Sequence, residues 1–214
     1  MTLAIFDMDG TIANTLFDLA DATNSGLRQL GYPEHDYDSY RYFVGNGAVK
    51  LCERALPDDR KQDTQKLHQL FKEYYGAHYM DKTVLYEGIA DMLKKLSESG
   101  VALAIATNKP QNFAVEIAKL LLPDIPFVSV LGGCEERPKK PDPAIIREIM
   151  RSLPEAPEKA FMIGDSNVDM ETARNAGLIA IGCPWGFRGR DELESAGADF
   201  IPESPAQIAE IILR

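Results

Sequence analysis

Cysteine is scarce in this chain of 214 residues, and no two cysteines have CxxC spacing. Cys52, Cys134 and Cys183 are odd in number and far apart, so the sequence predicts neither a disulfide framework nor a zinc site. Cysteines of this kind are usually small buried side chains in a reducing compartment. The sequence also lacks 18 uninterrupted apolar residues and a basic segment leading into a long apolar run. We therefore expect a cytoplasmic protein that does not associate with membranes.

Basic residues are in deficit, with 23 Lys and Arg against 33 Asp and Glu, for a formal net charge of −10. A duplex DNA or RNA partner would require a basic surface, so we expect no nucleic acid partner. A small phosphorylated metabolite needs only a local positive pocket and remains compatible with this charge. The composition, 45% hydrophobic and 26% charged, is typical of a globular protein. It leaves open whether the chain is a monomer or a homodimer.

Short apolar runs alternate with segments of helical periodicity. The runs that read as buried strands are residues 3–6, 101–106, 161–163 and 178–181. Continuous apolarity is expected when a parallel sheet is covered on both faces. Alternating strands and helices predict a doubly wound α/β domain with a parallel sheet.

One long segment interrupts this alternation. More than ninety residues separate Phe6 from Val101, which is far more than one crossover requires. This part has no strand-like run and shows helical patterns at 16–30, 49–56 and 64–79. We expect residues 15–81 to form an inserted helical unit, and residues 1–14 and 82–214 to form the core.

Polar side chains follow three of the predicted strands. They are Asp7 and Asp9, then Thr107 and Asn108, then Asp165 and Asp169, while Lys140 precedes a predicted helix. Ligands collect at the carboxyl ends of the strands in open parallel sheets. We therefore expect these side chains to share one site.

Asp7 and Asp9 are two residues apart, so their side chains would leave the same face of a continuing strand. Two such close carboxylates repel each other, and a divalent cation would relieve the repulsion. Oxygen ligands together with substrate phosphate favour Mg²⁺, and Asp165 would complete the metal site.

These residues together can hydrolyse a phosphomonoester. Mg²⁺ and Lys140 would neutralise the phosphoryl charge, and Thr107 and Asn108 would donate hydrogen bonds to its oxygens. Asp7 would attack phosphorus and form an aspartyl-phosphate. Asp9 would protonate the leaving alkoxide and then accept a proton from the hydrolytic water.

Each supporting residue also has a structural interpretation. Thr107 and Asn108 could form an ordinary turn, and Lys140 could be a surface lysine, with Lys139 as an alternative. Asp169 would orient Lys140 or a metal-bound water from outside the ligand set.

The assembled motifs resemble those of the haloacid dehalogenase superfamily, in the subgroup with a helical cap inserted after the first strand. They are Asp7-Met8-Asp9-Gly10-Thr11, then Thr107-Asn108, then Lys140-Pro141, then Gly164-Asp165-Ser166-Asn167-Val168-Asp169. The resemblance implies a Rossmann-like core, Asp7 as nucleophile and Asp9 as acid–base. It also implies Mg²⁺ held by Asp7, Asp165 and the backbone carbonyl of Asp9, with Asp169 and Ser166 in the surrounding layer.

Within the superfamily, several stretches resemble phosphoglycolate phosphatases. One is Gly45-Asn46-Gly47, where that group places its substrate-facing cap loop; glycines there would let backbone N–H groups approach a carboxylate. The resemblance implies 2-phosphoglycolate as substrate. Related sugar phosphatases, pyrophosphatases and β-phosphoglucomutase-type phosphomutases share most of these stretches. A receiver-like phosphoacceptor is a further alternative, but Asp9 and a cap argue against it.

Overall fold

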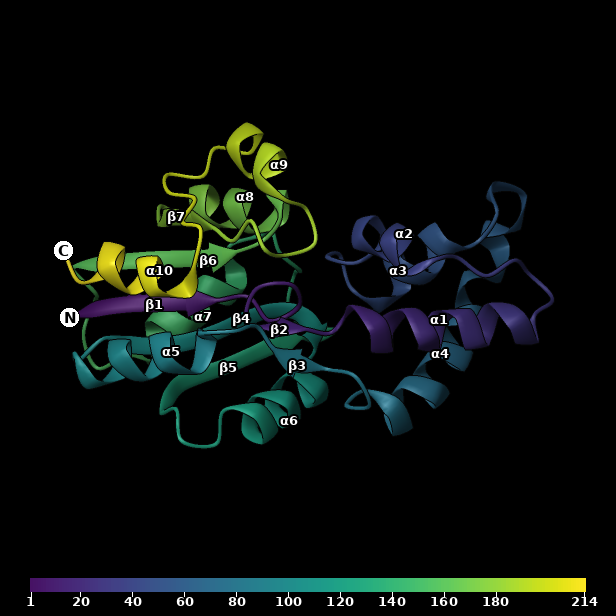
Figure 1. The fold of residues 1–214 in the computed structure, drawn as a ribbon, viewed down its shortest axis with the longest axis horizontal. Coiled ribbons are helices and arrows are strands. Elements are labelled where there is room, and N and C mark those ends of the chain that lie inside the picture. Colours follow the sequence, from purple (N-terminus) through teal and green to yellow (C-terminus); the bar gives the residue numbers. More distant parts are fainter. The chain divides into compact units, whose positions relative to one another are not determined.

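The computed structural model describes all residues from Met1 to Arg214, which divide into two compact units. The core unit comprises Met1–Ala13 and Leu85–Arg214, and the helical unit comprises Asn14–Val84. The chain passes between them twice, through β2 (Ala13–Asn14) and β3 (Val84–Leu85). These two short strands pair with each other, so both passages lie side by side (Figure 1).

The core unit is built on a five-stranded parallel sheet in the order β5-β4-β1-β6-β7. Its strands are β1 (Thr2–Phe6), β4 (Ala102–Pro110), β5 (Phe127–Gly133), β6 (Lys159–Gly164) and β7 (Ile179–Gly182). The central strand is almost entirely buried, because helices cover both faces of the sheet. The predicted Rossmann-like doubly wound α/β fold is confirmed.

Amphipathic helices supply the two covering layers. They are α5 (Ile89–Glu98), α6 (Gln111–Leu121), α7 (Ala144–Ser152), α8 (Asn167–Ala176), α9 (Arg190–Ser195) and α10 (Pro205–Ile212). On one face, Leu3 and Ile5 of β1 share a core cluster with Ile146 of α7, Met170 of α8 and Leu193 of α9. On the other face, α5 and α10 pack against each other over the sheet (Figure 1).

Two strands of the five-stranded sheet differ from the sequence prediction. β5 was not predicted, because it is an edge strand whose residues are mostly only partly buried, with Val128 49% exposed. β4 continues to Pro110 instead of ending at Ala106, so Thr107 and Asn108 belong to the strand and do not form a turn. The polar end of β4 is buried, which a pattern of hydrophobic residues alone cannot reveal.

The helical unit contains four α-helices and one short 3₁₀ helix. They are α1 (Leu16–Gln29), α2 (Tyr37–Phe43), α3 (Ala48–Ala55), the 3₁₀ segment Asp58–Asp63 and α4 (Thr64–His78). Helix α1 packs closely on α4, where a Cβ on Gly26 would lie only 2.7 Å from Leu67 Cδ1. The absence of that Cβ lets the two helices approach.

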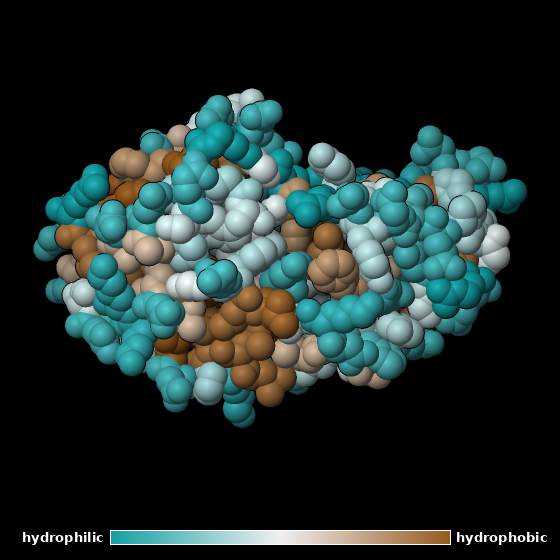
Figure 2. All heavy atoms as spheres, in the orientation of Figure 1, coloured by the Kyte–Doolittle hydropathy of each residue, from teal (hydrophilic) through white to brown (hydrophobic).

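The face of the molecule shown in Figure 2 is largely hydrophilic and carries several hydrophobic patches. Exposed large apolar side chains include Val84, Val115, Leu120 and Val128. No helix combines the length and the apolar character that a membrane crossing would need.

Asp18 joins the start of α1 to the segment that leaves the helical unit. Its buried carboxylate accepts hydrogen bonds from the backbone N–H of Lys82 at 3.0 Å, the N–H of Thr83 at 2.9 Å and the Thr83 hydroxyl at 2.7 Å. A buried carboxylate is tolerated when donors satisfy it in this way. Asp18 therefore holds the two ends of the unit together.

Asp18→Asn should destabilise the helical unit by about 2 kcal/mol, because an amide NH₂ would face N–H donors. Urea denaturation followed by circular dichroism measures the loss, and hydrogen exchange at Lys82 and Thr83 should accelerate. Asp21→Asn is the matched control, since Asp21 forms a surface ion pair with the Lys82 side chain. Equal losses in both variants would contradict a clamping role for Asp18.

Candidate active site

Three buried carboxylates converge at the carboxyl edge of the sheet. Asp7 directly follows β1, Asp165 directly follows β6, and Asp169 lies in the first turn of α8. One oxygen from each lies within 4.8 Å of the others. Strands β1 and β6 are neighbours at the point where the strand order reverses, which is where α/β sheets open a crevice for ligands.

Lys140 is the cation of this cluster. Its Nζ lies 3.0 Å from Asp7 Oδ1 and 2.6 Å from Asp169 Oδ1, and its side chain is 1% exposed. Lys139 is exposed, whereas Lys140 is the lysine that lies among these carboxylates. That Lys140 contacts phosphate stays a prediction. Burial opposes the charged ammonium, but the carboxylates of Asp169 and Asp7 raise the pKa of Lys140 overall.

Asn108 fixes the backbone of Lys140. The Asn108 amide donates to the Lys140 carbonyl at 3.1 Å, and its oxygen accepts from the Lys140 N–H at 2.9 Å. Asn108 therefore positions the residue that carries the positive charge. A hydrogen bond from its side chain to a phosphoryl oxygen stays a prediction.

The charge balance of the cluster fits a divalent cation. Burial raises the pKa of Asp7 to about 6, although Lys140 lowers it, and burial also raises the pKa of Asp165 well above its ordinary value. Three carboxylates and one ammonium leave two uncompensated negative charges when all are ionised. Hard carboxylate oxygens in this arrangement could hold a divalent metal ion.

Glycines allow the backbone to close around Asp165. A Cβ on Gly10, whose φ is +83°, would lie 2.2 Å from Asp165 Oδ2, and one on Gly186 would lie 2.2 Å from Asp165 Cβ. Asp165 also accepts hydrogen bonds from the Phe187 N–H at 2.7 Å and the Thr11 hydroxyl at 3.3 Å. These contacts fix the carboxylate before any ligand binds.

Asp169 and Ser166 together begin helix α8. Asp169 Oδ2 accepts hydrogen bonds from the Ser166 hydroxyl at 2.7 Å and the Ser166 N–H at 3.2 Å, while its Oδ1 accepts from Lys140. Both oxygens of Asp169 therefore have protein partners. Asp169 is suited to orienting Lys140.

Asp9 lies beside the cluster but outside the group of three carboxylates. Its Oδ1 is 2.9 Å from the Nζ of Lys109, a lysine that was not among the predicted site residues. Thr107 hydrogen-bonds to Asp7 and lowers its pKa. Because Thr107 and Lys109 are two residues apart on a strand, the period of two could have identified Lys109 as a site residue.

The predicted substrate loop lies in the helical unit, between α2 and α3. Gly45 and Gly47 have φ values of +116° and +87°, a backbone region that favours glycine. Arg54 of α3 donates to Asn46 Oδ1 at 2.7 Å and to the carbonyl of Phe43 at 2.9 Å. The turn is thus held by its own helix.

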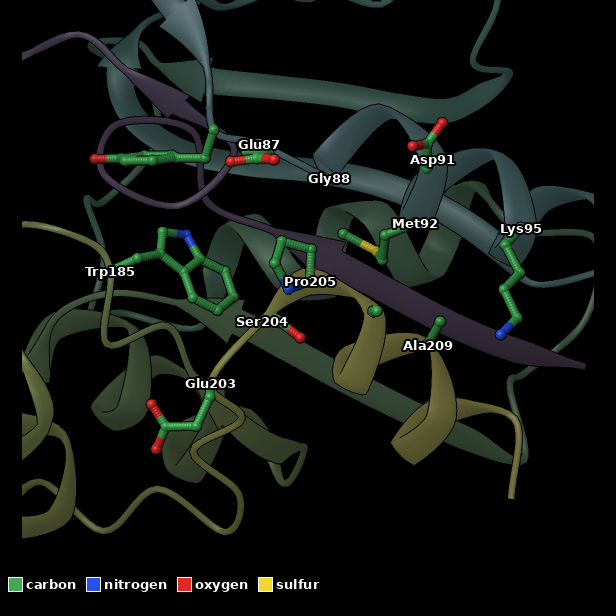
Figure 3. A pocket seen from close by; sticks show the side chains of 12 residues that line it. Glu87, Gly88, Asp91, Met92, Lys95, Trp185, Glu203, Ser204, Pro205 and Ala209 are labelled. Carbon is green, nitrogen blue, oxygen red and sulfur yellow. The ribbon is translucent and has the colours of Figure 1, made fainter.

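A groove of about 560 Å³ lies elsewhere on the core unit, between α5 and α10 (Figure 3). Met92, Pro205 and the Trp185 ring form part of its wall, and none of the predicted site residues line it. Trp185 nonetheless contacts the site loop, because its indole N–H donates to the Thr11 carbonyl at 3.1 Å.

Known proteins are similar to this chain in sequence and in fold. A phosphoglycolate phosphatase from Vibrio parahaemolyticus is 32% identical over 98% of this chain and 95% of its own length. One from Psychrobacter arcticus is 37% identical over 86% of this chain and 84% of its own. A solved structure from Lactobacillus delbrueckii subsp. bulgaricus has a TM-score of 0.92 at 31% identity, covering 98% of this chain and 97% of that one. Residues 4–183 match the haloacid dehalogenase-like hydrolase family, and the chain belongs to this family.

Proposed function

We propose that this hydrolase is a Mg²⁺-dependent phosphatase that forms an aspartyl-phosphate on Asp7, with 2-phosphoglycolate as its substrate. The observation that carries the proposal is the buried cluster of Asp7, Asp165, Asp169 and Lys140, with Asp9 directly beside it. A nucleophilic carboxylate, a cation and a second carboxylate are the groups that phosphoryl transfer to and from an aspartate requires. The phosphoglycolate phosphatases among its relatives support the choice of substrate.

Mg²⁺ would be held by the carboxylates of Asp7 and Asp165 and the backbone carbonyl of Asp9. Asp169 is a poorer ligand candidate, because Lys140 and Ser166 occupy its oxygens. The bound cation would neutralise negative charge on the phosphoryl group.

The side chains would then divide the reaction between them. Lys140, 3.0 Å from Asp7, keeps the nucleophile ionised and offers positive charge to the phosphoryl oxygens. An Asp7 oxygen attacks phosphorus as the bond to the leaving oxygen breaks, and Asp9 gives that oxygen a proton. Asp9 then accepts a proton from water, which attacks the aspartyl-phosphate and releases inorganic phosphate. The products are glycolate and phosphate, and Asp7 is regenerated.

The Gly45–Asn46–Gly47 turn is proposed to set substrate selectivity. Gly45 and Gly47 have positive φ values and no side chain, so the backbone of the turn would let a small carboxylate approach closely. The anchoring by Arg54 would keep this arrangement rigid.

Asp7→Asn should abolish phosphate release, because an amide is a far weaker nucleophile, while the fold remains intact. Phosphate release is measured with a colorimetric assay and the fold by circular dichroism. Asp124→Asn, an exposed substitution on the same unit, should retain full activity. Near-normal turnover by Asp7→Asn would refute the mechanism.

Mg²⁺ should change the fluorescence of Trp185, the single tryptophan of the chain. The Trp185 indole donates a hydrogen bond to Thr11, and its neighbours Gly186 and Phe187 pack against Asp165 and donate a hydrogen bond to it, respectively. A cation bound by Asp165 should therefore alter the environment of the indole. A chelator should reverse the change, and Asp165→Asn should abolish it while Asp124→Asn retains it. An unchanged response in Asp165→Asn would exclude Asp165 as a ligand.

2-Phosphoglycolate should give the highest kcat/KM in a panel of substrates that also includes sugar phosphates, nucleotides and pyrophosphate.

Gly47→Ala should reduce kcat/KM on 2-phosphoglycolate more than on an aryl phosphate, because the added Cβ strains a positive-φ residue in the turn. Equal losses on both substrates would argue against a substrate role for the turn. Isomerisation of a sugar phosphate without phosphate release would instead indicate a phosphomutase.

A further inference from the structure

We propose that Lys109 is a positioning residue that fixes the Asp9 carboxyl group for its two proton transfers. This inference rests on the proposed function and extends it to a lysine at the end of β4. The Lys109 side chain is 1% exposed, and its Nζ lies 2.9 Å from Asp9 Oδ1. Asp9 itself is 12% exposed, so the pair lies at the boundary between the protein interior and the site.

The residues at the end of β4 and those that follow β1 form two contacts, and the members of the second contact each lie two residues after those of the first. Thr107 hydrogen-bonds to Asp7, and Lys109 contacts Asp9, so neighbouring strands supply one partner for each carboxylate. The hydroxyl of Thr107 also accepts from the Lys109 N–H at 3.3 Å. Gly132 presses against this segment from β5, because a Cβ there would lie 2.6 Å from the Lys109 carbonyl oxygen. The backbone that carries Lys109 is therefore closely packed.

The hydrogen-bonding capacity of lysine determines what Lys109 can do for Asp9. An ammonium group donates hydrogen bonds and accepts none. Oδ1 of Asp9 must therefore accept from Lys109 whether Asp9 is ionised or protonated. When Asp9 acts as an acid, its proton is confined to Oδ2, which is thereby fixed as the donor to the leaving oxygen.

This role separates substrates by their leaving group. An alkoxide such as that of glycolate is strongly basic and needs a proton as the P–O bond breaks. A 4-nitrophenolate ion leaves without one. Loss of Asp9 positioning should therefore slow the first half-reaction on alkyl phosphates and have little effect on that of 4-nitrophenyl phosphate.

Lys109→Met removes the donor while keeping the length of the side chain. It should lower kcat/KM on 2-phosphoglycolate by about 100-fold and on 4-nitrophenyl phosphate by roughly 3-fold, in line with the usual contribution of general acid catalysis. Lys109→Arg, which retains a cationic donor, should recover part of the activity on 2-phosphoglycolate. Lys139→Met, which neutralises an exposed lysine, should match the unmodified protein on both substrates.

Equal losses on the two substrates would overturn the proposal and leave Lys109 with a structural role. If Lys109→Met does not fold, as judged by circular dichroism and by the Mg²⁺ response of Trp185, the comparison is made with Lys109→Arg. A longer, planar donor displaces Asp9, so that variant should still lose more activity on 2-phosphoglycolate than on 4-nitrophenyl phosphate, and equal activity would overturn the proposal. An unmodified protein that hydrolyses neither substrate would instead refute the proposed function itself.

Discussion

The burial of negative charge at one edge of the sheet is the constraint on which the rest of the site depends. Asp7, Asp165 and Asp169 are withdrawn from water, and Lys140 is the cation inserted among them. Burying carboxylates is costly unless cations and donors compensate each one. The compensation explains features that otherwise look unrelated. They include the hydrogen bonds of the Asn108 side chain to the Lys140 backbone, the first turn of α8 and the Phe187 N–H that donates to Asp165.

The topology of the sheet brings these groups together. Strands β1, β4 and β6 are adjacent in the sheet although their sequences are far apart, and all three end at the same edge. Asp7, Thr107 and Asp165 stand at or directly after the ends of these strands, so the strand backbone holds them in place. Lys140 lies in the connection between β5 and α7. The glycines at positions 10, 164 and 186 admit the close approach of neighbouring segments, because a Cβ on each would overlap Asp165 or Asp169.

The buried strands and the polar residues of the site were largely predictable from the sequence. The buried strands are continuous apolar runs, and the carboxylates and Lys140 follow them in a specific order, so periodicity and motif spacing were sufficient. Edge strand β5 was missed because most of its residues are only partly buried, and β4 was cut short because its last residues are polar yet buried. Lys109 was missed because β4 was predicted to end at Ala106, which concealed the two-residue spacing between Thr107 and Lys109 on one strand. Its partner Asp9 lies a hundred residues away along the chain. The bonding of Asn108 to the Lys140 backbone likewise depends on a tertiary contact that no local pattern encodes.

The Asp18 clamp also has a consequence for how the chain folds. β1 and β4 pair in the sheet, but the whole helical unit separates them in sequence. Joining distant segments costs loop-closure entropy, and the cost is incurred before their contacts form. When Asp18 binds the amides of Lys82 and Thr83, the folded helical unit already brings its two ends together. A segment of about seventy residues then behaves, for the purpose of sheet formation, as a short connection between two neighbouring strands.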